Sequence, residues 1–380
     1  SALTINSGSG RVNMAGNVSD VTTLTINSSH ASSEIAGVVS GSGSLVNSGT
    51  GGLILSAINT YTGATNINAG TLRVTGSLSD STAVTVASGA TYDVAASDTI
   101  ASLAGAGNVT LNSNTLTVGG STNTTYSGVM SGTGSLVKAG TATFTMSGAN
   151  TYTGGTTINA GTLALGANNV LADTGALNIA GGTLDIATFN DTVGTVTLSS
   201  GSITGTTGQL TSANYNVTNT TGTTAISAIL AGSGQLTKSG AGALTLSGAN
   251  TYTGGTTINA GTLKLTGGLS TATDVVMTNA AVWDLQAAQT VASLSMASGN
   301  SITNTAGTSS LTVSGTSTLA NSITTTGIQT YTGAVTLAAN TAINTTNSAV
   351  TFSAAVTGSG LAATGTEDAA AALAKARADV

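Results

Sequence analysis

The stretch Ser147–Leu163 reads SGANTYTGGTTINAGTL, and Ser247–Leu263 repeats it letter for letter. A looser copy, SAINTYTGATNINAGTL, occupies Ser56–Leu72, and a shortened one, TYTGAVTL, occupies Thr330–Leu337. The tyrosine that marks each copy is found at Tyr61, Tyr152, Tyr252 and Tyr331. Repetition on this scale decides the architecture, because one repeat can bury its apolar face only against the next.

A shorter period lies inside this unit. LTIN occurs at Leu3–Asn6 and again at Leu24–Asn27, and we place Val46–Asn47 and Ile67–Asn68 in the same column. Apolar and polar residues alternate within each segment, which predicts short strands with every second side chain buried. From the step between neighbouring segments we expect coils of about 20 residues, each with two or three strands, stacked in parallel.

The same step appears in the later copies. Val137 and Ile158 are separated by the same number of residues as the two LTIN segments, and so are Thr237 and Ile258. On this spacing we expect Val137 and Thr237 to occupy the column of the two isoleucines.

The composition agrees with a thin core and many tight corners. The 380 residues include 52 Gly, no Pro and no Cys, and only 5% are charged while 40% are hydrophobic. Strands that all donate to a hydrogen-bond ladder tolerate no proline, and corners between them favour glycine. The composition therefore favours an all-β solenoid over packed helices.

Charge argues against a nucleic-acid partner, and hydropathy argues against a transmembrane helix. The seven basic residues are scattered and the net charge is −6, whereas a nucleic-acid binder needs clustered cations. The chain has no apolar run long enough for a transmembrane helix. We expect no nucleic-acid partner and no transmembrane segment in this chain.

Residues that recur with the unit are interpreted as parts of the scaffold. The asparagine of each INAG turn and one aspartate of a later strand recur in three copies, as the marker tyrosine does. These structural repeat positions are Asn68, Asn159, Asn259, Asp93, Asp185, Asp284, Tyr61, Tyr152 and Tyr252. Asparagine is common at corners, and stacked asparagines can bond along the axis.

Two carboxylates could form the acid–base pair of a glycosidase, either Asp93 with Asp98 or Asp185 with Asp191. These aspartates recur with the unit, however, whereas a catalytic pair should be unique. His30 is the only histidine, which disfavours a catalytic triad or a metal cluster. We expect no catalytic residue, no cofactor and no metal, and hence no enzyme.

Trp283 takes the place that Tyr92 and Leu184 hold in the earlier units. The surroundings of Trp283 and the segment 289–304 are the least repetitive part of the chain. We take Trp283 as the candidate contact region for a partner, although burial of its ring is the simpler expectation.

The pattern divides the chain into residues 1–365, a solenoid of degenerate units that each hold several coils, and residues 366–380. These units are about 80 to 100 residues long, or four to five coils each. The second segment, TEDAAAALAKARADV, is rich in alanine, begins with a capping threonine and ends with cations. It predicts a short C-terminal helix.

Gly132–Gly166, GTGSLVKAGTATFTMSGANTYTGGTTINAGTLALG, resembles the passenger-associated repeat of bacterial autotransporters. Gly232–Leu265, GSGQLTKSGAGALTLSGANTYTGGTTINAGTLKL, resembles it as well. The resemblance extends from about Gly41 to Gly267. It implies a right-handed parallel β-helix that is secreted or displayed on the surface of a Gram-negative bacterium. It carries no catalytic residues, and the membrane barrel of such proteins is not part of this sequence.

Three functions remain open. Our main expectation is a non-enzymatic building block of a surface fibre or biofilm matrix that associates with itself, head-to-tail or laterally, through open coil ends. The alternative is an autotransporter-type adhesin that binds glycans or proteins on host or environmental surfaces. The third and least favoured is a polysaccharide-degrading β-helix enzyme.

Overall fold

The computed structural model describes residues 1–338, 341–346, 348–358 and 361–362. The chain divides into two compact units, Ser1–Gly194 and Thr195–Val380. Within the described residues every regular element is a β-strand. The helix expected over residues 366–380 lies outside the described residues.

The first unit consists of short strands joined by tight corners. They are β1 (Ala2–Gly8), β2 (Asn13–Met14), β3 (Thr23–Ser28), β4 (Ser33–Ile35), β5 (Ser44–Asn47), β6 (Gly52–Leu55), β7 (Thr65–Ile67), β8 (Thr71–Val74), β9 (Ala83–Val86), β10 (Thr91–Val94), β11 (Asp98–Ile100), β12 (Ser102–Gly105), β13 (Asn108–Thr110), β14 (Thr115–Val118), β15 (Thr124–Tyr126), β16 (Met130–Ser131), β17 (Ser135–Lys138), β18 (Thr143–Met146), β19 (Thr156–Ile158), β20 (Thr162–Leu165) and β21 (Leu177–Asp185). The strand β22 (Asp191–Thr204) begins in this unit and ends in the next.

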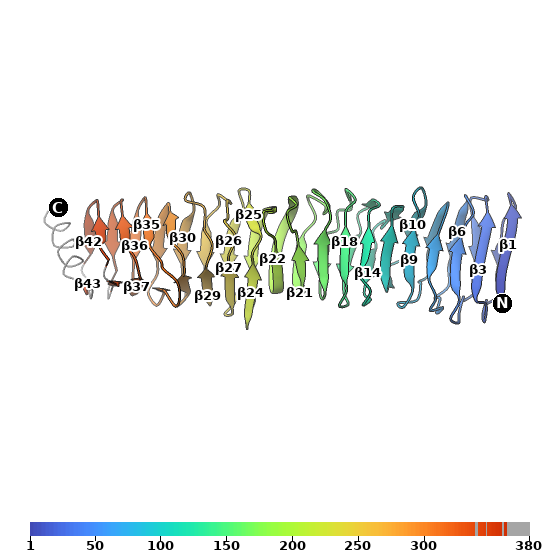
Figure 1. Cartoon of the computed structure of the whole chain (residues 1–380), viewed down its shortest axis with the longest axis horizontal. Helices are drawn as coiled ribbons and strands as arrows, with labels where there is room; N and C mark the ends of the chain where they lie inside the picture. Colours follow the sequence, from blue (N-terminus) through green and yellow to red (C-terminus); the bar gives the residue numbers. More distant parts are fainter. Residues whose placement is uncertain (339–340, 347, 359–360, 363–380) are drawn as a thin grey trace. The chain divides into compact units, whose positions relative to one another are not determined.

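The strands of the first unit pair in parallel, each with a strand of a neighbouring coil. One series runs β1–β3–β5–β7–β9–β12–β15–β18–β20–β21. A second sheet runs β2–β4–β6–β8–β10–β13–β16. In Figure 1 the arrows of this unit lie side by side in the order of the chain.

The second unit has the same construction. Its strands are β23 (Gln209–Val217), β24 (Thr223–Ile226), β25 (Ile229–Ala231), β26 (Gln235–Lys238), β27 (Ala243–Leu246), β28 (Thr256–Ile258), β29 (Thr262–Leu265), β30 (Asp274–Met277), β31 (Val282–Leu285), β32 (Gln289–Val291), β33 (Ser293–Met296), β34 (Ser301–Thr303), β35 (Leu311–Val313), β36 (Ser317–Leu319), β37 (Ser322–Thr325), β38 (Gln329–Tyr331), β39 (Val335–Leu337), β40 (Thr341–Thr345), β41 (Val350–Phe352), β42 (Val356–Gly358) and β43 (Leu361–Ala362).

Parallel pairing again links each coil to the next. One series runs β23–β26–β28–β30–β33–β36–β39–β42, and another runs β24–β27–β29–β31–β34–β37–β40–β43. A third sheet, β32–β35–β38–β41, forms towards the end of the unit. The prediction of an all-β parallel solenoid is confirmed.

The strand register confirms the expected length of one coil. Leu3 pairs with Leu24, which pairs with Leu45, and Leu45 pairs with Thr65. Alternate residues of most strands are buried, as in β3 and β20. Stacked leucines, isoleucines and valines therefore fill the interior of each coil, and hydroxyl-bearing residues dominate the outside.

The register differs from the predicted columns at one position. Ile26 pairs with Asn47 and not with Val46, and Ile158 and Ile258 pair with Lys138 and Lys238. The column assigned to Val46, Val137 and Thr237 was therefore wrong by one residue, which reverses the face on which each side chain lies. The reason is that the buried polar side chains at 47, 138 and 238 bind main-chain carbonyls inside the coil.

The glycine of each INAG turn is required by the backbone. Gly70, Gly161 and Gly261 have φ values of 62°, 64° and 68°, in the left-handed region. A Cβ atom on Gly70 would lie 2.1 Å from the main-chain oxygen of Gly51 in the preceding coil. The turn therefore excludes any side chain at this position.

Candidate functional site

The marker tyrosines belong to the core. Tyr61, Tyr152 and Tyr252 are almost fully buried, and each hydroxyl bonds the threonine four residues later. The Tyr152 Oη–Thr156 Oγ1 distance is 2.5 Å. Burial raises the pKa of each phenol above its ordinary value, and the threonine bond lowers it partly. These tyrosines are thus held neutral as packing groups with one internal hydrogen bond each.

A buried asparagine next to each tyrosine links three successive coils. Oδ1 of Asn150 accepts from the N–H of Met130 at 2.7 Å, and its Nδ2 donates to the oxygens of Gly148 at 2.9 Å and Val170 at 2.8 Å. The equivalent residues, which bond in the same way, are Asn59 and Asn250. Sequence reasoning missed this column, although the Asn-Thr-Tyr order of the three copies carried the signal.

In each copy, the corner that holds this asparagine is followed by a corner with another buried polar side chain, which is Asp98, Asp191 or Gln289. Asp98 accepts from the N–H of Leu78, Asp191 accepts from the N–H groups of Val170 and Leu171, and Gln289 accepts from that of Leu269. Burial raises the pKa of Asp98 and of Asp191 to about 6, against the lowering effect of these hydrogen bonds. Oδ1 of Asp191 is buried without a hydrogen-bond partner.

The asparagines of the INAG turns lie nearer the surface. Asn68 and Asn159 are exposed and Asn259 is half-buried. Their main-chain N–H groups bond the preceding coil, as in Asn159 N–H to Lys138 O at 2.8 Å. The Asn259 side chain accepts from Thr278 Oγ1 at 2.9 Å. In the part of the chain that the structure describes, no hydrogen bond joins one INAG asparagine side chain to another.

Asp93, Asp185 and Asp284 share one register position, opposite Arg73, Ala164 and Lys264 of the preceding coil. Their partners differ. Asp93 binds Arg73 Nη1 and Asn112 Nδ2, Asp185 accepts from the N–H of Ala187, and Asp284 accepts from Thr305 and Gln286.

Asp93 and Asp98, the first acid–base pair considered from the sequence, lie in different surroundings. Asp93 lies half-buried on the outer face with Arg73, whereas Asp98 is buried in the core with Tyr92. Asp191 likewise bonds buried main-chain amides.

The indole of Trp283 is fully buried, and it pairs in register with Leu263 as Tyr92 pairs with Leu72. Its ring therefore cannot stack on an external ligand. Whether the surface over segment 289–304 touches a partner stays a prediction.

Two lysines are buried instead of lying at a solvated edge. Lys138 is 1% exposed, and its Nζ donates to the oxygens of Ala139 at 2.6 Å, Gly140 at 3.0 Å and Ala160 at 3.3 Å. Lys238 binds the equivalent Gly240 and Ala260 oxygens. Burial lowers the pKa of both ammonium groups. In the first copy Asn47 takes this place and donates to Ala69 O at 3.0 Å.

The outer face of the first unit over β2–β10 collects charges that are scarce elsewhere. Arg11 Nη2 lies 3.3 Å from Glu34 Oε2, and Arg73 Nη1 lies 2.5 Å from Asp93 Oδ2. These are the two ion pairs found within the described ranges. Surface pairs of this kind contribute little to stability, so their position is more informative than their energy.

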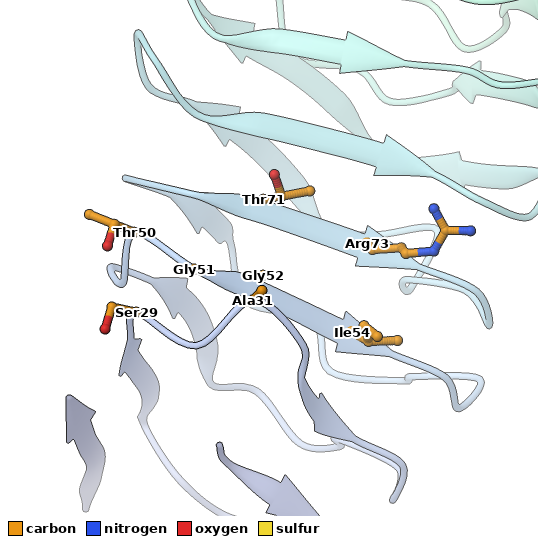
Figure 2. A pocket seen from close by; sticks show the side chains of 8 residues that line it. All are labelled: Ser29, Ala31, Thr50, Gly51, Gly52, Ile54, Thr71 and Arg73. Atoms are coloured by element: carbon orange, nitrogen blue, oxygen red, sulfur yellow. The ribbon is translucent and has the colours of Figure 1, made fainter. Parts of the chain in front are cut away.

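A groove of about 430 Å³ opens on this face (Figure 2). Figure 2 shows Ser29 and Thr50 at one end, Arg73 and Ile54 at the other, and the small residues Gly51, Gly52 and Ala31 between them. The pairing of β6 with β8 positions these residues, because Gly52 pairs with Thr71 and Ile54 with Arg73. The groove therefore combines a guanidinium, three hydroxyls and two apolar side chains, those of Ile54 and Ala31.

Neither a metal centre nor a membrane helix emerges from the described residues. They contain no group of three or more His, Asp or Glu side chains close enough to hold a metal ion. Among the same residues no helix is long and apolar enough to cross a membrane.

These coils and their repeated corners define a parallel β-solenoid. The passenger-associated-transport-repeat matches residues 40–74, 136–165 and 236–265 of this chain. The chain is also 39% identical over 215 residues to the adhesin BmaC autotransporter of Brucella suis biovar 1 (strain 1330). The match covers 53% of this chain and 6% of that protein, so the chain spans a small part of its relative. No solved structure matches the chain. The resemblance noted from the sequence is confirmed.

Proposed function

We propose that this chain is part of the passenger of an adhesin that acts outside a bacterial cell, where it binds host or environmental surfaces. The observation that carries this proposal is the homology over 215 residues to an autotransporter adhesin. The three matched repeats support export as a passenger and hence a surface-exposed or secreted location.

The internal chemistry supports a scaffold that presents an outer surface. Buried tyrosines, asparagines, aspartates and lysines bond within the solenoid, so these recurring polar groups are used to hold successive coils together. We propose that the chain is not an enzyme, and the separation of Asp93, which pairs with Arg73 on the outer face, from Asp98, which bonds Tyr92 in the core, supports this.

Attachment of coated particles tests the proposal. Beads carrying the full chain are compared with beads carrying serum albumin, for retention on cultured epithelial cells, on extracellular-matrix proteins and on glass. Retention of the coated beads above the albumin control on at least one surface is expected. Equal retention on every surface would contradict the proposal.

Self-association into a fibre or biofilm matrix, our main expectation from the sequence, stays a prediction. The homology favours the adhesin, and the fibre is tested separately below.

A further inference from the structure

Several residues that line the groove of the first unit are replaced by different residues at the same positions of the other repeat copies. In the second copy Thr143, Thr145 and Ala164 stand where the first has Gly52, Ile54 and Arg73, and in the third copy Ala243, Thr245 and Lys264 do so. The strand register of these residues is the same in all three copies. Stacking in this register therefore does not itself require the side chains of Ile54 and Arg73, which leaves them available for another role.

The small residues open the floor of the groove. Gly51 and Gly52 leave the backbone of β6 uncovered next to Ala31, whereas a threonine at the position of Gly52 would stand in this space. A Cβ atom on Gly52 would lie 2.3 Å from the oxygen of Ala31, so the close approach of the two coils also requires glycine here. The packing of the two coils therefore requires glycine at position 52. As a consequence, no side chain covers the floor of the groove there.

Part of the Arg73 guanidinium, at one end of the groove, is not engaged by protein groups of the described residues. Arg73 is 47% exposed, and Nη1 is its only nitrogen that bonds a protein group among the described residues. Asp93 holds this nitrogen and is itself held by Asn112 Nδ2 at 2.6 Å. The Nε–Nη2 edge is left for a planar anion, and a guanidinium edge binds a carboxylate through two parallel hydrogen bonds.

The remaining lining is suited to a hydroxylated ring. Thr50 and Thr71 offer hydroxyls that can donate or accept, and Ile54 offers an apolar contact. The Ser29 hydroxyl donates to Gly8 O at 3.1 Å, so it is left to accept a hydrogen bond. A sugar ring has hydroxyls at its rim and C–H groups on its faces, and a volume of about 430 Å³ accommodates one or two such rings.

We propose that this groove binds a sugar that carries a carboxylate, with the carboxylate on Arg73 and the ring over Ile54 and Gly52. The proposal rests on the proposed adhesin function, for which it names the ligand class. Uronic acids of polysaccharides and nonulosonic acids at the ends of cell-surface glycans share this chemistry.

Titration of the full chain with defined sugars tests the proposal. The acidic probes are methyl glucuronide and N-acetylneuraminyl lactose, which represent the two sources, and their neutral counterparts are methyl glucoside and lactose. Binding is followed by saturation-transfer NMR and calorimetry. We expect at least one acidic probe to bind about tenfold or more tightly than its neutral counterpart, with an affinity that falls as salt is added.

Substitutions locate the site. Arg73→Ala should weaken binding by about tenfold or more, and Arg73→Lys should restore only part of it, because an ammonium lacks the two-pronged edge. Lys264→Ala is the matched control, since Lys264 has the same register in the third copy, and it should leave binding unchanged. Circular-dichroism melts confirm that the variants are folded, and Ile54→Thr, which adopts the residue of the other copies, is a second probe of the groove that should also weaken binding.

Three results would overturn the proposal: equal affinity for acidic and neutral sugars, unchanged binding in folded Arg73→Ala, or equal affinity for a tetraglutamate peptide. The bead assay separates this inference from the proposed function. If Arg73→Ala beads adhere as the unsubstituted chain does, the groove is not the adhesive site although the chain is an adhesin. If unsubstituted beads do not adhere, the adhesin is contradicted, while the solution titration still decides the sugar site.

Discussion

The hydroxyl of Tyr92 donates to Oδ2 of Asp98 at 2.7 Å inside the first unit. Oδ1 and Oδ2 of the same carboxylate also accept from the N–H of Leu78, each at 3.2 Å, so the pair ties two coils together at one corner. In the next copy Leu184 replaces the tyrosine, and the equivalent Asp191 has a buried oxygen without a partner. In the third copy the acid itself is replaced by Gln289.

These two buried acids predict that the solenoid is more stable in mild acid. Burial raises the pKa of Asp98 and Asp191 from 3.8 to about 6 in the folded chain, so the folded state binds more protons between these values. Their contribution is therefore most favourable below about pH 4 and is lost as the pH rises through 6, by at most about 3 kcal/mol per carboxyl. Urea unfolding at about pH 4 and about pH 7.5 measures the difference. The double variant Asp98→Asn, Asp191→Asn should show a smaller dependence, and an unchanged one would contradict this assignment.

Asn150→Ala should destabilise the first unit strongly. The substitution leaves the N–H of Met130 and the oxygen of Val170 buried without partners, at a cost of about 1 to 3 kcal/mol for each group. Asn159→Ala is the control, because this asparagine of the same repeat is exposed, and it should change stability by less than about 0.5 kcal/mol. Denaturant unfolding and hydrogen exchange at Met130 compare the two. Equal effects would show that the buried column does not hold the coils.

Tyr152→Phe should cost about 1 to 2 kcal/mol, because it leaves the buried hydroxyl of Thr156 without its partner. Thr156→Val should have a similar cost. The double variant should lose less than the sum of the two, since it removes both polar groups together. Additive losses in this double-mutant cycle would mean that the hydroxyls are not coupled.

Lys138→Asn should be tolerated better than Lys138→Met. Asparagine at the equivalent position 47 already donates to the carbonyl of Ala69, whereas methionine leaves the carbonyls of Ala139, Gly140 and Ala160 without a donor. Thermal melts of the two variants should differ by several degrees. A higher melting temperature for Lys138→Met would show that burial of the ammonium costs more than its hydrogen bonds return.

If the chain forms a fibre by stacking exposed coil ends, its sedimentation coefficient should rise with protein concentration. Analytical ultracentrifugation over a wide concentration range, with electron microscopy of the same samples, measures this. A constant monomeric value over the whole range would rule out the fibre for this chain.

Much of the fold could be predicted from the repeats alone. The step between the two LTIN segments predicted parallel coils of about 20 residues, because that period places like residues on like, and the alternation within LTIN predicted the strands. What alternation could not supply was the register at Asn47, Lys138 and Lys238. A polar side chain at an inward position is unexpected unless its partners are known, and those partners include carbonyl groups in a corner of the next coil.

The sequence by itself determined the fold class, since the length of the coil and the positions of its corners follow from the local periodicity. Only the tertiary structure decided which side of each coil a polar residue faces. It buried Trp283, Asp98 and Lys138 and brought Arg73, Ile54 and Ser29 to one groove. The physical reason is that stacking brings residues of different coils into contact. Burial, hydrogen bonds and grooves therefore depend on neighbours in other coils, which no single segment of the chain contains.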